Sequence, residues 1–182
     1  MKMSILDPGI RDLLFDYLAE KHEKFRFMEE VVIGSSRADV VIVLENELIG
    51  CEIKSDADSY ARLASQTKNY DKYFDRNMVV VGTSHRAGVR EHVPPHWGIF
   101  CAAQGGGIEL VREAGINKKV KLKNQLSLLW RAELGDIQRL NSMPKYYDKS
   151  RRFVIPKILE KAEPETLRRQ ICAELIERDY TV

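Results

Sequence analysis

The spacing of apolar residues divides the first half of the chain into two helical and four extended segments. Helices are indicated where apolar positions recur every three or four residues, and strands where β-branched and apolar residues form short runs. The expected elements, in chain order, are a helix at 7–22, strands at 25–33, 40–44 and 48–54, a helix at 59–75 and a strand at 78–81. The last strand is wholly apolar, which is typical of a central, buried position. Asp7-Pro8 has the composition of a helix start, and Asp56 and Asp58 are expected to cap the second helix.

The second half of the chain continues the sheet and then becomes helical. We expect a turn or short helix at 85–92, strands at 97–103 and 108–112 joined by a turn at 104–107, and helices from 124 onward, at 150–161 and at 163–179. The whole pattern predicts an α/β fold with an αβββαβ core and a mixed central sheet. Residues 1–115 should form this core, and residues 116–182 a C-terminal helical extension packed on it. The last two helices also allow a helix-turn-helix, but a lid on the core is the favoured interpretation.

Composition adds limits rather than a function. A chain of 182 residues that is 44% hydrophobic can bury a real core in one compact domain. Its three cysteines lack paired spacing, which indicates a reducing cytoplasm and argues against a zinc site, and Cys51 is interpreted as a small core residue. No stretch resembles a signal peptide or a membrane span, so we expect a cytoplasmic protein with no membrane partner. The net charge of +2 is too small to indicate nucleic-acid binding by itself.

Three charged residues stand out in the predicted hairpin formed by residues 40–44 and 48–54. Asp39 precedes the first strand, and Glu52 and Lys54 end the second. If the turn is centred near residue 46, paired positions sum to about 92, which places Asp39 opposite residue 53 or an immediate neighbour. Glu52 and Lys54 share one face because side chains alternate along a strand. Two carboxylates and an ammonium group should therefore converge at the end of the hairpin; the alternative is a surface hairpin with salt-bridged charges.

The convergence of Asp39 and Glu52 is typical of a divalent-metal site. Hard oxygen ligands favour Mg²⁺ or Mn²⁺, and the Ile53 carbonyl is a candidate for a further oxygen ligand. Such a cation eases deprotonation of a bound water and stabilises charge on a phosphate. Lys54 would orient or deprotonate that water, or neutralise the charge that grows on the phosphate.

With these residues in place, the chain resembles the PD-(D/E)XK nuclease superfamily, which has the restriction-endonuclease-like fold. Asp39 matches the motif aspartate, Glu52-Ile53-Lys54 matches (D/E)-x-K, and Gln66 with Tyr70 resembles the Q-x-x-x-Y motif of some exonuclease-like branches. The proline before the motif aspartate is here Ala38, a common departure. The resemblance implies a metal-dependent nuclease with Asp39, Glu52, Lys54, Gln66 and Tyr70 as its catalytic group. Tyr70 as a packing residue and Gln66 as a solvated side chain are the alternatives.

Further segments are similar to a family of small stand-alone bacterial nuclease-like proteins. They are the run from Gly50 to Tyr70, the segment from Leu128 to Glu133 and the closing Leu175 to Arg178, so the similarity covers nearly the whole chain. By analogy with related nucleases, Glu30 is a candidate for an additional metal ligand, preferred over Glu29. A solvated pair of acids is the alternative.

Basic residues cluster between the core and the predicted helical extension. The candidate nucleic-acid contacts are Lys118, Lys119, Lys121 and Lys123, which together with Arg112 face one acid, Glu113. Such a strip could track a phosphate backbone; the alternative is a solvated loop. The basic run at 149–152 is a second candidate, but acids dilute the tail, which is interpreted as structural.

These observations favour a metal-dependent nuclease that uses Mg²⁺ or Mn²⁺ and acts on DNA. Two other classes stay open: a catalytically silent nuclease fold that binds nucleic acid, and a phosphodiesterase acting on RNA or on a nucleotide. A homodimer is compatible with the sequence, which does not fix the oligomeric state.

Overall fold

A mixed sheet forms the centre of the computed structural model, which describes residues 7–103 and 105–180. Within this part of the chain six strands lie side by side in chain order: β1 (Arg26–Ile33), β2 (Ser36–Val43), β3 (Leu48–Lys54), β4 (Arg76–Val81), β5 (Gly98–Ala102) and β6 (Ile108–Arg112). β3, β4 and β5 run parallel, and the other neighbouring pairs are antiparallel. The predicted central position of the apolar fourth strand is confirmed.

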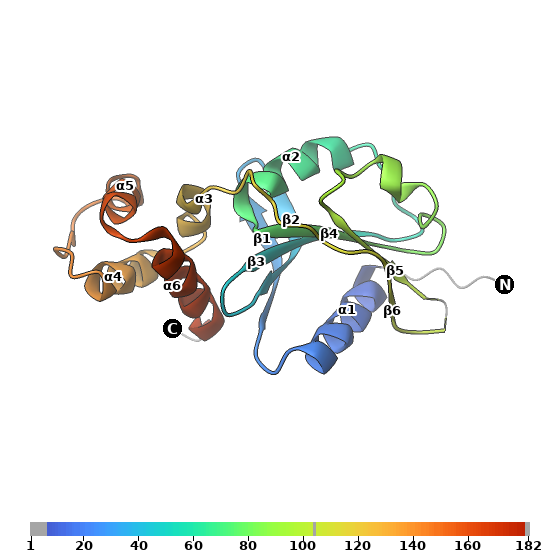
Figure 1. Ribbon diagram of the computed structural model, residues 1–182, viewed down its shortest axis with the longest axis horizontal. Coiled ribbons are helices and arrows are strands. Elements are labelled where there is room, and N and C mark those ends of the chain that lie inside the picture. The colour runs from blue at the N-terminus through green and yellow to red at the C-terminus, as the bar shows by residue number, and fades with distance from the viewer. Residues whose placement is uncertain (1–6, 104, 181–182) are drawn as a thin grey trace.

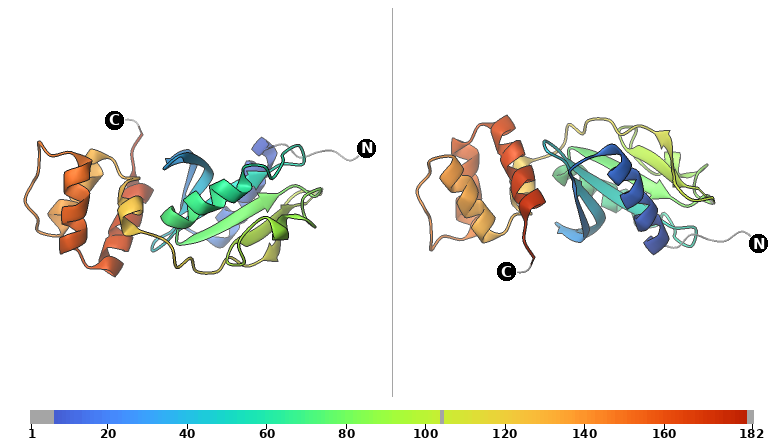
Figure 2. Two further views of the ribbon diagram at one scale, coloured as in Figure 1. Left: turned by 90° about the horizontal axis from the view of Figure 1, so that it is seen from above. Right: turned by 90° about the horizontal axis from the view of Figure 1, so that it is seen from below.

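The two faces of the sheet are covered by different helices (Figures 1 and 2). α1 (Asp7–Lys21) packs on one face through residues such as Leu14, and α2 (Leu63–Tyr73) packs on the other through Leu63 and Tyr70. α2 is also the crossover between the parallel strands β3 and β4. The predicted α/β fold and the order αβββαβ are therefore confirmed.

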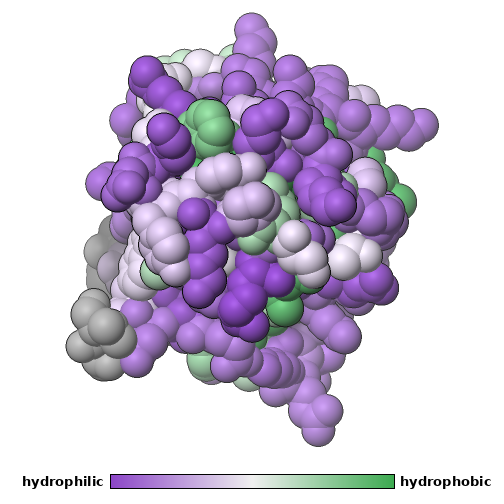
Figure 3. Space-filling view, turned by 90° about the vertical axis from the view of Figure 1, so that its left-hand side faces the viewer, coloured by the Kyte–Doolittle hydropathy of each residue, from purple (hydrophilic) through white to green (hydrophobic). Residues whose placement is uncertain are grey.

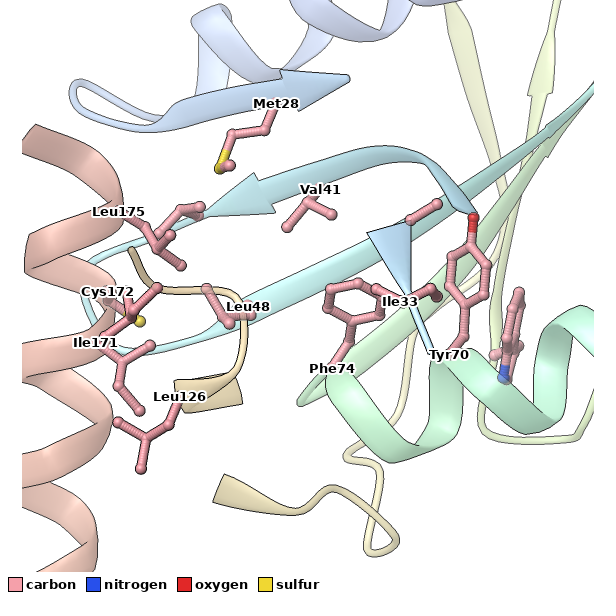
Figure 4. Packing of buried hydrophobic residues seen from close by; sticks show 14 of the residues in the cluster. Met28, Ile33, Val41, Leu48, Tyr70, Phe74, Leu126, Ile171, Cys172 and Leu175 are labelled. Atoms are coloured by element: carbon pink, nitrogen blue, oxygen red, sulfur yellow. The ribbon is translucent and has the colours of Figure 1, made fainter. Parts of the chain in front are cut away.

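After β6 the described chain becomes helical. The helices are α3 (Leu122–Leu126), α4 (Arg131–Leu140), α5 (Arg151–Lys161) and α6 (Pro164–Glu177). They gather beyond one end of the sheet (Figure 1), where Leu48 of β3 lies close to Leu126, Ile171 and Leu175 in one hydrophobic cluster (Figure 4). The helices are thus fixed to the sheet by shared apolar packing, while the domain boundary at residue 115 stays a prediction.

The second helix begins later than the apolar pattern predicts. α2 starts at Leu63 rather than near residue 59 and has no side-chain cap. Asp58 accepts hydrogen bonds from the backbone and hydroxyl of Ser55 at 2.8 and 2.6 Å, and Asp56 accepts from the backbone and hydroxyl of Ser84 at 2.9 and 2.7 Å. The prediction that these aspartates cap the helix is wrong, because their carboxylates instead hold the loop that leaves β3.

Most other elements lie within a few residues of their predicted positions. Residues 85–92 form turns with a short 3₁₀ helix, η1 (Val89–Glu91). The predicted turn at 104–107 includes residue 104, which lies outside the described residues. Cys51 is fully buried, as expected of a core residue. No helix in the described ranges combines the length and apolarity needed to cross a bilayer.

Candidate active site

The end of the β2–β3 ladder brings Asp39 and Glu52 together. The last paired residues are Val40 and Cys51, so the register places Asp39 opposite Glu52, one residue from the expected partner. The Asp39 carboxylate accepts a hydrogen bond from the Ile53 backbone N–H at 2.7 Å. Asp39 lies inside β2, whereas the sequence pattern predicts it before the strand, and the end of the β2–β3 pairing fixes its carboxylate against the backbone of β3.

Glu52 and Lys54 form a buried ion pair on the face of β3 that α2 covers. Lys54 Nζ lies 2.7 Å from Glu52 Oε1, and the two side chains are only 6% and 1% exposed. They share this face because strand side chains alternate. Burial of an unpaired charge is strongly unfavourable, so the fold can bury Glu52 and Lys54 only because they are paired with each other. The alternative of a solvated surface hairpin does not hold for these two residues.

α2 supplies two further partners of Glu52 from positions one helical turn apart. Gln66 Nε2 donates to Glu52 Oε1, and the Tyr70 hydroxyl donates to Glu52 Oε2 at 2.7 Å. With Lys54, three donors therefore satisfy one buried carboxylate. The structure thus brings the (D/E)-x-K and Q-x-x-x-Y residues into a single hydrogen-bonded cluster.

Tyr70 links the hydrophobic core to this cluster. Its ring is fully buried, and its hydroxyl accepts the Asp39 backbone N–H at 3.1 Å. Burial, with neighbouring carboxylates, raises the pKa of the Tyr70 phenol well above its usual value, so the hydroxyl stays protonated and donates. Gly50 makes room for the ring, because a Cβ there would lie 2.7 Å from Tyr70 and 2.2 Å from Phe74. Tyr70 is therefore a packing residue and a positioning residue at once.

Asp39 is a partly buried carboxylate beside a second negative charge. Burial, followed by the negative charge of Glu52, raises the pKa of Asp39 to about 7, against the opposing effects of the Ile53 N–H and Lys54. Two carboxylates held close together repel each other unless a proton or a cation lies between them. At neutral pH this end of the hairpin therefore favours binding of positive charge.

The oxygen atoms at this position fit a hard divalent cation. The carboxylates of Asp39 and Glu52 supply charge, and the Ile53 carbonyl points to the same side as the Ile53 N–H, toward Asp39. Gln66 Oε1 is buried without a hydrogen-bond partner among the described atoms, which leaves it free to accept from water. In the described ranges no three His, Cys, Asp or Glu side chains form a metal-binding group. Mg²⁺ commonly uses one or two carboxylates and keeps several waters, which matches this donor set.

Glu30 lies across from Asp39 but is bound by arginines. The β1–β2 register places Glu30 opposite Asp39, and its φ of 55° interrupts the ladder. Its carboxylate forms ion pairs with Arg11 at 2.7 Å and with Arg37 at 2.6 Å. Arg11 also donates to the Asp39 carbonyl at 2.9 Å. The structure therefore does not bring Glu30 together with Glu52, and its role as a metal ligand stays a prediction.

A polar cleft with a volume of about 550 Å³ opens beside Asp39 and Gln66. The β1–β2 turn and the start of α2 form its walls, with the hydroxyl and guanidinium side chains of Ser35, Ser36, Arg37, Arg62 and Ser65. These groups are the donors that proteins use to bind phosphate oxygens. These residues could not be predicted from the sequence, because no spacing connects the turn at 34–37 with the segment at 62–65.

Comparison with known proteins places the whole chain in one family. Residues 2–181 match the sequence profile of a family described as Bacteriophage P4 protein cII. The chain belongs to this family. No curated protein matches this cII-family chain. A solved structure of Pyrococcus furiosus SfsA in complex with Ca²⁺ is similar over 66% of this chain and 68% of its own, with 16% identity and a TM-score of 0.36. A likeness this distant carries no argument about chemistry.

The lysine strip of this cII-family protein lies away from the cleft. Lys118, Lys119, Lys121 and Lys123 are exposed along the segment that leads from β6 through the start of α3 (Figure 1). Lys119 Nζ pairs with Asp71 at 3.1 Å, near the C-terminal end of α2, whereas Gln66 lies near the other end of that helix. The strip is therefore not part of the cluster around Glu52, and its contact with nucleic acid stays a prediction.

Replacing Asp39 with asparagine should make the stability of the cII-family protein less sensitive to pH. Since the folded pKa of about 7 lies above the ordinary aspartate value, the folded state binds the extra proton, and this group lowers the free energy of unfolding as pH rises from about 4 to 7. In EDTA, the stability of Asp39→Asn relative to wild type should be about 1 kcal/mol greater at pH 8 than at pH 5, after allowance for partial solvent screening. Urea unfolding at the two pH values measures this, and a pH-independent difference would contradict the assigned pKa.

Proposed function

We propose that this protein is a metal-dependent nuclease that hydrolyses phosphodiester bonds of DNA. The observation that carries the proposal is the convergence of Asp39, Glu52 and Lys54 at the open end of a hairpin, beside a cleft rich in phosphate-binding donors. The resemblance of the same residues to the PD-(D/E)XK motif supports this function.

Asp39, Glu52 and the Ile53 carbonyl would hold Mg²⁺ or Mn²⁺. When bound, such a cation supplies charge stabilisation at the phosphate and makes a water easier to deprotonate. Glu30 is the candidate for an additional ligand if it leaves its arginine partners.

Lys54 is the residue of this cluster proposed to act on the reacting groups. Glu52 holds its ammonium group at the end of β3, where it would donate hydrogen bonds to the attacking water or to phosphate oxygens that gain negative charge. In hydrolysis a water oxygen forms a bond to phosphorus, one phosphorus–oxygen ester bond breaks, and the leaving oxygen takes up a proton. Gln66 and Tyr70 would act as positioning residues, because they hold Glu52 in place.

The cleft beside the cluster fits the backbone of a nucleic acid. Arg37 and Arg62 line the cleft together with Asp39, and three serines of the lining add their hydroxyl groups. Arg37 pairs with Glu30 across a partly exposed contact of 2.6 Å, so a phosphate would compete with Glu30 for Arg37.

Incubation of the purified full chain with nucleic acids tests the proposal. Single-stranded, double-stranded and branched DNA and a matched RNA would each be incubated with Mg²⁺, Mn²⁺ or EDTA, and the products resolved by size. The proposal predicts shortened DNA products with the cations and none with EDTA. Cleavage of RNA alone would move the substrate to RNA, and no cation-dependent product on any substrate would leave only the silent binding protein.

A further inference from the structure

The connection between α4 and α5 carries a concentration of positive charge at the end of the molecule opposite α1. Residues 141–150 link the two helices, and this loop lies at the far end of the helical extension (Figure 1). From residue 143 to residue 153 the basic side chains are Lys145, Lys149, Arg151 and Arg152, and one acid, Asp148, opposes them. The face that contains this end is predominantly hydrophilic (Figure 3).

Two aromatic rings, Tyr147 and Phe153, are partly exposed among these charges, and the Phe153 ring also packs edge-to-face on Tyr146 at 5.2 Å between centroids. Tyr147 is 77% exposed and Phe153 is 41% exposed. A lysine ammonium lies near each ring: Lys145 at 5.7 Å from the Tyr147 centroid and Lys149 at 5.8 Å from the Phe153 centroid. Exposed aromatic rings within a basic surface are the groups on which nucleic-acid bases stack in proteins that bind single strands.

Hydrogen bonds from α4 hold the loop between α4 and α5 in place. Arg131 of α4 donates to the Tyr146 carbonyl and, at 3.3 Å, to the Lys149 carbonyl. A pocket with a volume of about 400 Å³ lies beside the loop, lined by Arg131, Arg139, Tyr146 and Tyr147 among others. The rings and lysines therefore project from a loop that hydrogen bonds to α4 hold in place, next to a pocket.

We propose that this surface, formed by Lys145, Tyr147, Lys149, Arg152 and Phe153, binds single-stranded nucleic acid. Unpaired bases would stack on the Tyr147 and Phe153 rings, while the basic side chains contact the phosphates. A duplex hides the faces of its bases, so exposed rings can stack only on a strand that is not paired.

The proposal rests on a nucleic-acid substrate and adds a second contact site to the cleft beside Asp39. The exposed strip Lys118, Lys119, Lys121 and Lys123 lies on the segment between the sheet and the helices (Figure 2), which adds a basic region between the two proposed contact sites. A single strand in an extended conformation carries a phosphate charge at every nucleotide, so one strand would reach both the loop surface and the cleft. The surface would then hold single-stranded regions while the cleft receives the bond to be cut.

Binding to the full wild-type chain in EDTA, which withholds the divalent cation that the proposed cleavage needs, tests the proposal. Fluorescence anisotropy with a labelled oligothymidylate and with a duplex of equal length gives the two dissociation constants. Adding Tyr147→Ala should weaken binding to the single strand about 10-fold and leave the duplex within about twofold, because stacking on one ring is lost. Adding Tyr147→Phe keeps the ring and should retain the affinity, which makes it the matched control.

The charge of the surface gives a second measurement that does not depend on the tyrosine. Replacing Lys145, Lys149 and Arg152 together with glutamine should flatten the salt dependence of single-strand binding by about two units of slope, at about 0.7 per phosphate contact. Unchanged single-strand affinity in Tyr147→Ala, or an equal loss for the duplex, would overturn the proposal. The wild-type protein could show no cleavage and still bind single strands in a Tyr147-dependent way. In that case the nuclease function fails and this site stands.

Discussion

Lys54→Ala should lower the rate of phosphodiester cleavage by about 10³-fold, within the range known for loss of one positioned acid–base or electrostatic group. The ammonium group of Lys54 is the only basic side chain bound to Glu52 among the described residues, so no described neighbour replaces it. Nucleic-acid affinity should change by less than about threefold, because one lysine is a small part of the phosphate contacts. Single-turnover cleavage and anisotropy on the same substrate separate these two effects.

The control for Lys54→Ala is a lysine of the same charge outside the site. Lys21→Ala removes an exposed ammonium group at the end of α1 and should leave both cleavage and affinity unchanged. Because Lys54 is buried, its loss also threatens the fold, so circular dichroism and Lys54→Met, which keeps most of the apolar stem, accompany the assay. A folded Lys54 variant that cuts as fast as wild type would remove the lysine from the mechanism.

Arg178→Ala should reduce the free energy of unfolding by about 3 to 5 kcal/mol, the cost of leaving a buried charge without its partner. Arg178 follows α6 and binds the Glu133 carboxylate of α4 through two nitrogen atoms, at 2.6 and 2.7 Å. It also donates to the Leu128 carbonyl at 2.9 Å and stacks over the Trp130 ring at 4.4 Å. Its removal would therefore strand Glu133, which is only 7% exposed.

An exposed ion pair at the C-terminal end of α6 provides the comparison for Arg178. Lys24 pairs with Glu177 of α6, and both side chains are 70% exposed, so Lys24→Ala should cost less than about 1 kcal/mol. Chemical denaturation of the two variants measures both values. A loss below about 1 kcal/mol for Arg178→Ala would mean that the helices of the extension do not depend on this contact.

The charged cluster could be predicted from sequence because it depends on local geometry. Period-two alternation put Glu52 and Lys54 on one face, turn position placed Asp39 opposite them to within one residue, and helical spacing put Gln66 and Tyr70 one turn apart. Each of these relations spans a hairpin or a single helix. Two other segments that resemble the nuclease-like family end in Glu133 and Arg178. These two residues form a buried contact between helices, so this part of the resemblance reflects packing and not the charged cluster.

The rest of the site depends on contacts between segments that no local period connects. Arg11 reaches Glu30 and the Asp39 carbonyl from α1. The sequence spacing of Arg11 accounts only for its pairing with Asp7, four residues earlier on the same helix. The position of Arg62 beside the β1–β2 turn follows from how α2 lies on the sheet. The late start of α2 had the same origin, because the aspartates before it bond to distant or preceding loop residues.

Calorimetric titration with Mn²⁺ at pH 8 tests the central claim, that Asp39 and Glu52 hold a divalent cation beside Lys54. The wild-type protein should bind Mn²⁺, and Asp39→Asn should bind it at least about 10-fold more weakly, because one of two carboxylate ligands is lost. Asp12→Asn, which neutralises an exposed carboxylate on α1, should bind as wild type does. Equal Mn²⁺ affinity in wild type and Asp39→Asn, or no binding by the wild type, would contradict the account.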